Sequence, residues 1–205
     1  LADELRHRFR LDADRRIRTF SRGERMKAAL LCALAQRPRL LILDEPFAGL
    51  DVAVKDELVR GFLGAAAERG TTILIATHDL AEVETLIDGV AFLDRGRLLF
   101  SAMMDEVRAR FTRVEAAGME GGDATATALE EFDDVDGLEI LSVERAGSRV
   151  GLLISSTSGE VDEARARQWF PTATWIEVRP ASLREIFIAI ARGPASSIQL
   201  EEVGV

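Results

Sequence analysis

Apolar residues follow two alternating patterns through the first half of the chain. They recur at helical spacing from Gly23 to Gln36, where Pro38 ends the run. The continuous apolar run Leu40–Leu43 is typical of a strand that is buried on both faces of a sheet. A second helical pattern covers Val52–Arg69, and Thr71–Thr77 is another apolar run, rich in β-branched residues. Strands that alternate with helices of this length predict parallel βαβ units.

The pattern continues with shorter elements up to Phe111. We expect a helix over Asp79–Ile87, then two strands within Gly89–Ser101 that join at Arg95 and Gly96, and a helix over Met103–Phe111. These elements complete the first predicted domain, residues 1–111, whose fold class is α/β with a parallel sheet and helices.

The second half predicts a different plan. Ala116–Ala126 is rich in small residues and glycine, as in a loop or domain junction. After this loop we expect a helix, and then the following elements: strands Leu138–Arg145 and Arg149–Ser155, helix Glu160–Trp169, strand Thr174–Arg179 and helix Ser182–Arg192. With a strand near Thr112–Ala116, the order is βαββαβ and predicts a small α+β, ferredoxin-like domain over residues 112–193. Residues 194–205 are predicted to be a flexible tail.

Charge separates the same two halves. Through Phe111 there are 18 acidic and 18 basic residues, whereas 17 acidic and 8 basic residues follow, so the net charge of −9 belongs to the second half. An acidic chain argues against a nucleic-acid surface, and we expect no nucleic-acid partner. The single cysteine, Cys32, has no disulfide partner in the chain, which fits a cytoplasmic location.

Three ionisable residues stand where two predicted strands end. Asp44 and Glu45 follow the first strand, and His78 follows the second. Ligands of open parallel sheets bind beyond the carboxyl ends of the strands, so these residues share the functional edge. One carboxylate could hold a hard cation such as Mg²⁺ while the other polarises a water molecule. Each residue alone is equally compatible with an ordinary loop position.

The segment Ser21–Glu24 begins the first helix and has two possible roles. Ser21 and Glu24 form an S-x-x-E capping box, which stabilises a helix start without any ligand. The same helix end presents free N–H groups and positive partial charge, and Gly23 lets a phosphate approach the backbone closely. Both interpretations remain open from these residues alone.

The order of these motifs resembles that of the ATP-binding-cassette (ABC) ATPase family. FSRGE (Phe20–Glu24) is similar to the family signature LSGGQ, LLILDE to the Walker B strand, AGLD (Ala48–Asp51) to the D-loop, and Thr77-His78 to the H-loop. The resemblance covers residues 1 to about 111 and implies that this domain is part of a P-loop NTPase fold.

The resemblance also implies roles for single residues. Asp44 would hold Mg²⁺ through water, Glu45 would polarise the attacking water, and His78 would contact the γ-phosphate of ATP. Ser21, Arg22, Gly23 and Glu24 would bind, in trans, the ATP of a second ABC ATPase subunit, and Asp51 would cross the interface between the two subunits.

Two signature positions depart from the family pattern. Arg22 replaces a glycine and could pair with phosphate, whereas Glu24 replaces glutamine and would repel phosphate unless its carboxylate folds back onto the cap. Near the other end of the chain, Pro180–Gly193 resembles the helix that closes the C-terminal extension of many ABC-2-type subunits, whose last motif is of the L-E-x-x-F kind. The corresponding residues would be Leu183, Glu185 and Phe187. The alternative interpretation is that this segment is an amphipathic helix with a packing role alone.

The sequence contains no G-x-x-x-x-G-K-[ST] motif, because neither Lys27 nor Lys55 follows a glycine. From the resemblance we expect a truncated ABC ATPase that lacks its N-terminal part and is inactive by itself. The leading hypothesis is the ATPase subunit of a bacterial ABC-2-type exporter, peripheral to the cytoplasmic face of the membrane and paired with a transmembrane permease subunit. The alternatives are a non-transport ABC protein and a non-hydrolysing module that completes another subunit's ATP site.

Overall fold

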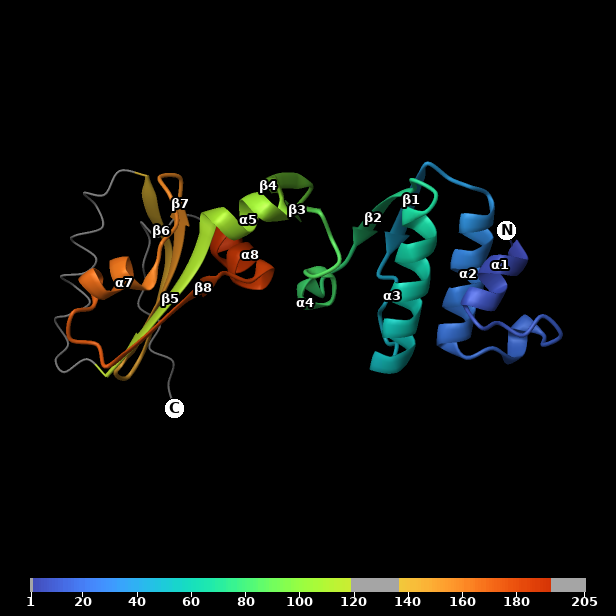
Figure 1. The fold of residues 1–205 in the computed structure, drawn as a ribbon, viewed down its shortest axis with the longest axis horizontal. Helices are drawn as coiled ribbons and strands as arrows, with labels where there is room; N and C mark the ends of the chain where they lie inside the picture. Colours follow the sequence, from blue (N-terminus) through green and yellow to red (C-terminus); the bar gives the residue numbers. More distant parts are fainter. Residues whose placement is uncertain (1, 119–136, 193–205) are drawn as a thin grey trace. The chain divides into compact units, whose positions relative to one another are not determined.

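The computed structural model describes residues 2–118 and 137–192 (Figure 1). Contacts divide the chain into two compact units, Leu1–His78 (unit 1) and Asp79–Val205 (unit 2). Among the described helices, none is long and apolar enough to cross a lipid bilayer.

Unit 1 combines helices with one pair of parallel strands. Its elements are α1 (Ala2–Arg8), a 3₁₀ turn (Ile17–Thr19), α2 (Arg22–Ala35), β1 (Leu40–Asp44), α3 (Val52–Ala67) and β2 (Thr72–Ala76). Strands β1 and β2 pair in parallel from Leu40 opposite Thr72 to Asp44 opposite Ala76, and α3 connects them. The predicted βαβ unit and the mixed α/β class are therefore confirmed.

One expectation about these strands is wrong for the described residues. Leu40, Ile42 and Leu74 are 52%, 65% and 56% exposed, so one face of the β1–β2 pair is open to solvent. Burial alternates along both strands, because only the opposite face is covered by packed side chains. An apolar run reveals that a strand is suited to burial on both faces, but it does not reveal what covers each face.

Unit 2 begins with short elements that connect to a four-stranded sheet. Its elements are α4 (Leu80–Val83), β3 (Gly89–Asp94), β4 (Arg97–Met103), α5 (Met104–Arg110), β5 (Phe111–Ala117), β6 (Leu138–Ala146), β7 (Arg149–Ser156), α7 (Glu163–Trp169), β8 (Trp175–Pro180) and α8 (Leu183–Arg192). Helix α4 is shorter than the predicted Asp79–Ile87, because the chain turns after Val83 with a bond from Leu86 N–H to the Val83 carbonyl oxygen.

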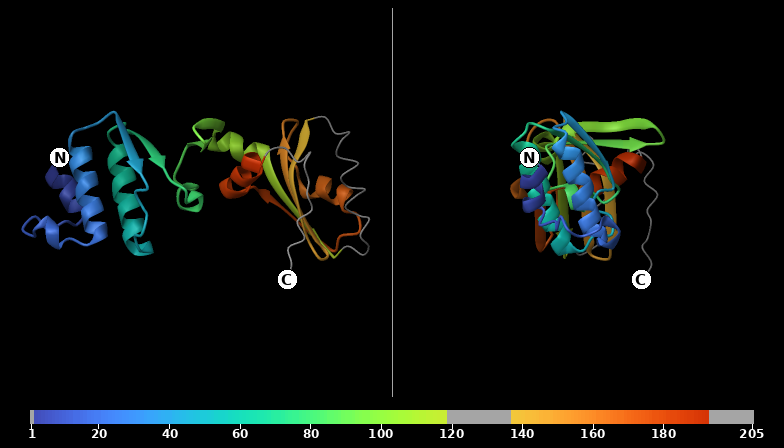
Figure 2. Two further views of the ribbon diagram at one scale, coloured as in Figure 1. Left: turned by 180° about the vertical axis from the view of Figure 1, so that it is seen from behind. Right: turned by 90° about the vertical axis from the view of Figure 1, so that its right-hand side faces the viewer.

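The four-stranded sheet has the order β6-β7-β5-β8, with every neighbouring pair antiparallel. This order agrees with the predicted ferredoxin-like plan. Helices α7 and α8 lie on opposite sides of the sheet (Figures 1 and 2). The helix expected before β6, and the predicted tail, lie outside the described residues.

Each face of this sheet carries its own core. Trp169 at the end of α7 and Phe170, which follows it, pack with Val114 and Leu152 on one face. On the other face Leu183 and Ile186 of α8 pack with Phe111 at the start of β5 and with residues of the segment that precedes the sheet, which are Phe92, Met104 and Val107. Because residues 92–111 share this core with α8, they pack with the second unit, and the two compact units divide after His78. The predicted domain boundary lies later, between residues 111 and 112. The division by packing does not test that domain boundary, which stays a prediction.

Candidate active site

The parallel register of β1 and β2 brings the predicted carboxylate and histidine together. The Glu45 N–H donates to the Ala76 carbonyl oxygen at 2.9 Å, so Glu45 continues the ladder by one residue beyond β1. The backbone N–H of His78 donates to Glu45 Oε1 at 2.9 Å, and His78 Nδ1 contacts the same oxygen. The hydroxyl of Thr77 donates to Glu45 Oε2 at 2.9 Å. Both carboxylate oxygens therefore accept hydrogen bonds from the end of β2.

The backbone at Glu45 has an unusual conformation. Its φ angle is +45°, in the left-handed region that residues other than glycine rarely occupy. This angle ends β1 abruptly after Asp44 and directs the Glu45 side chain toward the residues that follow β2. Strained backbone of this kind occurs preferentially at functional sites.

The pKa of Glu45 lies below its usual value of 4.5. The largest cause is the hydrogen bond from the His78 side chain. Burial comes next and acts in the opposite direction, and the Thr77 hydroxyl and the His78 N–H lower the pKa further. The Glu45 carboxylate is therefore ionised at neutral pH. The His78 ring itself is 86% exposed, so it is open to a ligand on its solvent side.

Asp44 is exposed, and its side chain makes no hydrogen bond or ion pair among the described residues. The described part of the chain contains no group of three or more His, Cys, Asp or Glu residues that could hold a metal ion. A single free carboxylate fits Mg²⁺ that is bound mainly by water and phosphate oxygens, which is the usual arrangement at nucleotide sites. Asp44 could supply that one carboxylate.

The start of α2 contains the predicted capping box. The Glu24 N–H donates to Ser21 Oγ at 3.2 Å, and the Ser21 N–H donates to Glu24 Oε2 at 2.8 Å. Glu24 is thus folded back onto the cap, which is the condition under which a glutamate was expected to tolerate phosphate. The hydrogen bond from the Ser21 N–H, followed by that from Arg15, lowers the pKa of Glu24.

The signature and D-loop segments touch within unit 1. A Cβ atom on Gly49, whose φ is +68°, would lie 2.5 Å from Nη1 of Arg22. A Cβ on Gly23 would overlap the side chain of Val54 on α3. Asp51 caps α3, because its carboxylate accepts from the Val54 N–H at 2.9 Å. In this structure Asp51 thus has a structural role, and its place at a subunit interface stays a prediction.

Two contributors to the site were missed by the sequence argument. Thr77 was read only as part of the H-loop resemblance, although a hydroxyl at the end of a strand beside a carboxylate is a natural donor. Arg15 lies six residues before Ser21 in an irregular segment, where no periodicity or motif marks it.

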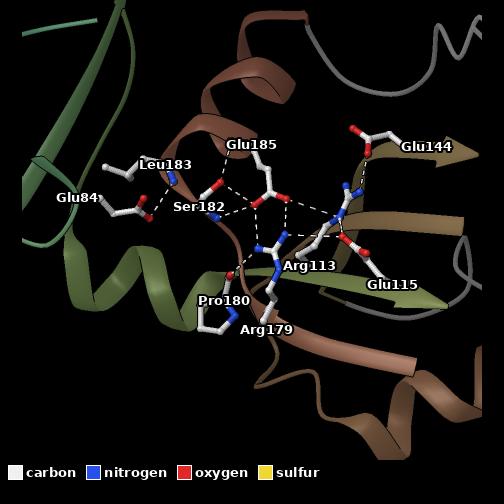
Figure 3. Close-up of polar contacts among 9 residues, drawn as sticks. All are labelled: Glu84, Arg113, Glu115, Glu144, Arg179, Pro180, Ser182, Leu183 and Glu185. Atoms are coloured by element: carbon white, nitrogen blue, oxygen red, sulfur yellow. Dashed lines mark hydrogen bonds and ion pairs between the residues drawn. The ribbon is translucent and has the colours of Figure 1, made fainter. Parts of the chain in front are cut away.

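A network of charged side chains also lies in unit 2 (Figure 3). Arg179 binds both oxygens of Glu185, at 2.7 and 3.0 Å. Arg113, whose side chain is only 8% exposed, lies 2.5 Å from Glu144, 3.3 Å from Glu115 and 3.7 Å from Glu185. Gly151, opposite Glu115 on β7, leaves room for the Arg113 guanidinium.

Glu185 also holds the start of α8. Its carboxylate accepts from the Ser182 N–H at 2.8 Å, and the next free amide, the Leu183 N–H, donates to Glu84 at 3.1 Å (Figure 3). Burial alone would raise the pKa of Glu185, but the hydrogen bonds from Arg179 and Ser182 outweigh it and lower the pKa to about 2. Leu183 is fully buried and Phe187 packs against Phe92, so all three residues likened to the L-E-x-x-F motif have a packing or capping role. Only Leu183 and Phe187 stand at the spacing of that motif, because Arg184 occupies its glutamate position and Glu185 follows one residue later.

Comparison with known proteins then indicates a family. A family described as "AAA domain, putative AbiEii toxin, Type IV TA system" matches residues 5–84. The ABC transporter ATP-binding protein YtrB of Bacillus subtilis is 28% identical over 188 residues, which cover 92% of this chain and 60% of the relative. The molybdenum import ATP-binding protein ModC of Rhodopseudomonas palustris is 27% identical over 200 residues, 88% of this chain and 52% of the relative. These homologues support the family of ABC transporter ATP-binding proteins.

Two further similar proteins match a smaller share of the chain. The Fe(3+) ions import ATP-binding protein FbpC of Pseudomonas fluorescens is 42% identical over 79 residues, 38% of this chain and 22% of the relative. A solved structure titled "Structure of ATP binding subunit of ABC transporter" is 34% identical and covers 51% of this chain and 44% of its own, with a TM-score of 0.45. The chain spans less than two thirds of the length of the relatives named here. FbpC and ModC are named as import proteins, so they do not support the predicted exporter branch.

Proposed function

We propose that this chain contributes the catalytic carboxylate of an ABC-type ATPase subunit that drives a membrane permease. The observation that carries the proposal is the position of Glu45 at the carboxyl ends of two parallel strands, bound by Thr77 and His78. The homologues support the ATP-binding family, and the geometry supports this role for Glu45.

The partners of Glu45 keep it in the form of a base. A carboxylate whose pKa is lowered by hydrogen bonds is ionised at neutral pH and can accept a proton from a water molecule, while the same hydrogen bonds make it a weaker base. Thr77 and the His78 N–H fix the direction of the carboxylate without a full neighbouring positive charge, unlike an ion pair with arginine. His78 is then placed to donate a hydrogen bond to a phosphoryl oxygen. Asp44 would hold Mg²⁺, which neutralises phosphate charge when bound.

The start of α2 completes the proposal. Its free amides, with Ser21 and Arg22, would bind the terminal phosphate of ATP that a second ABC ATPase subunit holds. ATP would thus be enclosed between two subunits, and its hydrolysis would separate them. Because the sequence contains no phosphate-binding G-x-x-x-x-G-K-[ST] motif, we also propose that these 205 residues alone do not turn over ATP.

The exporter branch is a narrower proposal. Its support is the resemblance of the segment from Leu183 to Phe187 to the L-E-x-x-F motif, in which Glu185 is displaced by one residue. The names of FbpC and ModC as import proteins count against it. Transport by inverted membrane vesicles that contain the subunit and its permease distinguishes the directions, because an exporter accumulates its cargo inside them and an importer does not.

The proposed activity is tested with the protein expressed from its complete reading frame and assembled with its permease. We expect Glu45→Gln to reduce steady-state ATP hydrolysis by about 10²- to 10⁴-fold, the usual contribution of a general base. Glu163→Gln, on the exposed surface of α7, is the matched control and should keep the wild-type rate. Equal rates for Glu45→Gln and wild type would refute the role of Glu45.

A further inference from the structure

Arg15 makes a set of contacts with the start of α2 that no motif predicted. Its Nη1 donates to Glu24 Oε1 at 2.6 Å, and its Nη2 lies 3.4 Å from Glu24 Oε2. The same Nη2 donates to the carbonyl oxygen of Thr19 at 2.9 Å. The guanidinium therefore binds both oxygens of one carboxylate, a geometry that arginine provides and lysine does not.

Besides the Glu24 carboxylate and the Thr19 carbonyl oxygen, an aromatic ring also contacts Arg15. Its guanidinium carbon lies 5.3 Å from the centre of the Phe20 ring, within the range of a cation–π contact, and Phe20 is buried. Phe20 immediately precedes Ser21, the cap of α2. Carboxylate, carbonyl and ring thus hold Arg15 beside the first turn of this helix.

The position of Glu24 creates an electrostatic conflict within the proposed phosphate site. Its carboxylate lies in the first turn of α2, beside the amides that are proposed to bind the terminal phosphate of ATP. A carboxylate there stabilises the helix, but it repels a second anion at the same amides. The bidentate contact with Arg15 supplies a compensating positive charge at that carboxylate.

We propose that Arg15 is a positioning residue that makes a glutamate at position 24 compatible with phosphate binding at the start of α2. Arg15 does so by holding the Glu24 carboxylate folded onto the Ser21 cap and by neutralising its charge. This inference rests on the proposed function, since it concerns the same phosphate site. It adds that Arg15 and Glu24 act as a unit, so that the effect of losing Arg15 depends on the residue at position 24.

The test is a double-mutant cycle on the assembled ATPase, with the KM for Mg-ATP and kcat measured separately. We expect Arg15→Gln to raise KM roughly 10-fold, because one uncompensated charge then faces the phosphate, with a smaller change in kcat. In the background of Glu24→Gln, which has no charge to compensate, Arg15→Gln should change KM by less than about 3-fold.

Two further variants separate charge from shape. Arg16→Gln removes the same charge from the neighbouring residue, whose side chain does not cap the 3₁₀ turn, and should leave KM within about 2-fold of wild type. Arg15→Lys keeps the charge without the fork and should give a KM between those of wild type and Arg15→Gln, even if Arg15→Gln folds poorly.

Three outcomes are possible. Rescue of Arg15→Gln by Glu24→Gln supports the inference, because contacts with Thr19 and Phe20 alone would not depend on the charge at position 24. An equal KM defect in both backgrounds overturns the inference while leaving the proposed ATPase function intact. If the assembled wild-type protein does not hydrolyse ATP, both the proposed function and the role of Arg15 are overturned.

Discussion

Two glutamates with lowered pKa values, Glu45 and Glu185, occupy very different surroundings. Glu45 lies at an open strand end in unit 1, and its hydrogen bonds come from a hydroxyl, a backbone amide and an exposed imidazole. Glu185 lies in unit 2 between two arginines and the start of α8, and its side chain is 25% exposed, compared with 34% for Glu45. The same direction of pKa shift therefore arises from two different kinds of site.

The difference shows how a reactive carboxylate can be told from a structural one. Every contact of Glu185 joins elements of the fold, namely α8, β5 and β8, so its charge is used for packing. The contacts of Glu45 come from the residues that follow a single strand and orient the carboxylate, and no arginine among the described residues pairs with it. A lowered pKa becomes informative about function only together with the partners of the group.

The largest expected difference is in the stability of unit 2. Glu185→Gln should lower the free energy of unfolding of unit 2 by about 3 kcal/mol at neutral pH, because it leaves Arg179 without its bidentate partner. Urea unfolding followed by tryptophan fluorescence measures this unit alone, since both tryptophans, Trp169 and Trp175, belong to it. Glu45→Gln is the matched control and should leave this transition unchanged. Equal midpoints for the two variants would contradict the distinction.

The stability of unit 2 at acid pH gives a second test of the role of Glu185. The pKa of Glu185 is about 2 in the folded protein and 4.5 in its ordinary state, so its ionised form stabilises unit 2 above pH 4.5. That contribution, about 3 kcal/mol, should disappear progressively as the pH falls from 4.5 toward 2. Unfolding free energies measured across this range should fall more steeply in wild type than in Glu185→Gln. Parallel curves for the two proteins would show that Glu185 does not carry the effect.

Each unit also contains a glycine that lies against an arginine side chain, Gly151 against Arg113 in unit 2 and Gly49 against Arg22 in unit 1. Gly151→Ala should destabilise unit 2 by about 2 kcal/mol, because the buried Arg113 cannot move without losing its carboxylate partners. Gly49→Ala should cost unit 1 about 1 kcal/mol, mainly for the positive φ, since Arg22 is exposed and free to shift. Hydrogen exchange of the amides in each unit measures the two effects separately. A larger loss for Gly49→Ala would reverse the expected order.

The smallest expected effect concerns Thr77. Thr77→Val removes the hydroxyl that donates to Glu45 and should move the pKa of Glu45 upward, toward its usual value. In the assembled ATPase, the acid limb of the pH profile of kcat should shift to higher pH by a fraction of a unit. Thr77→Ser keeps the hydroxyl and should retain the wild-type profile, whereas identical profiles for valine and wild type would exclude the contact.

Most of the fold could be predicted from the sequence, because its signals are local. Helical spacing and Pro38 defined α2, and the apolar runs defined β1 and β2. The open face of the β1–β2 pair could not be predicted, since burial depends on which other segments cover a strand. The length of α4 was also missed, because Leu86 bonds back to Val83 and ends the helix early.

The site was predictable to a similar extent. Placing Glu45 and His78 at one sheet edge required only the rule that parallel strands end together, and the register confirms it. The contact between Arg15 and Glu24 was not predictable, because it depends on an irregular segment whose path has no sequence period. Gly49 and Arg22 likewise meet through the tertiary fold. The catalytic, phosphate-binding and interface roles of the site residues stay predictions.

The left-handed backbone at Glu45 implies that unstrained backbone and catalytic activity require different residues at this position. Glycine adopts a φ of +45° without steric penalty, so a glycine there would relieve the strain in the backbone. The same replacement would delete the group proposed to activate water, together with its hydrogen bonds from Thr77 and His78. Relief of backbone strain therefore favours glycine at this position, whereas turnover requires glutamate.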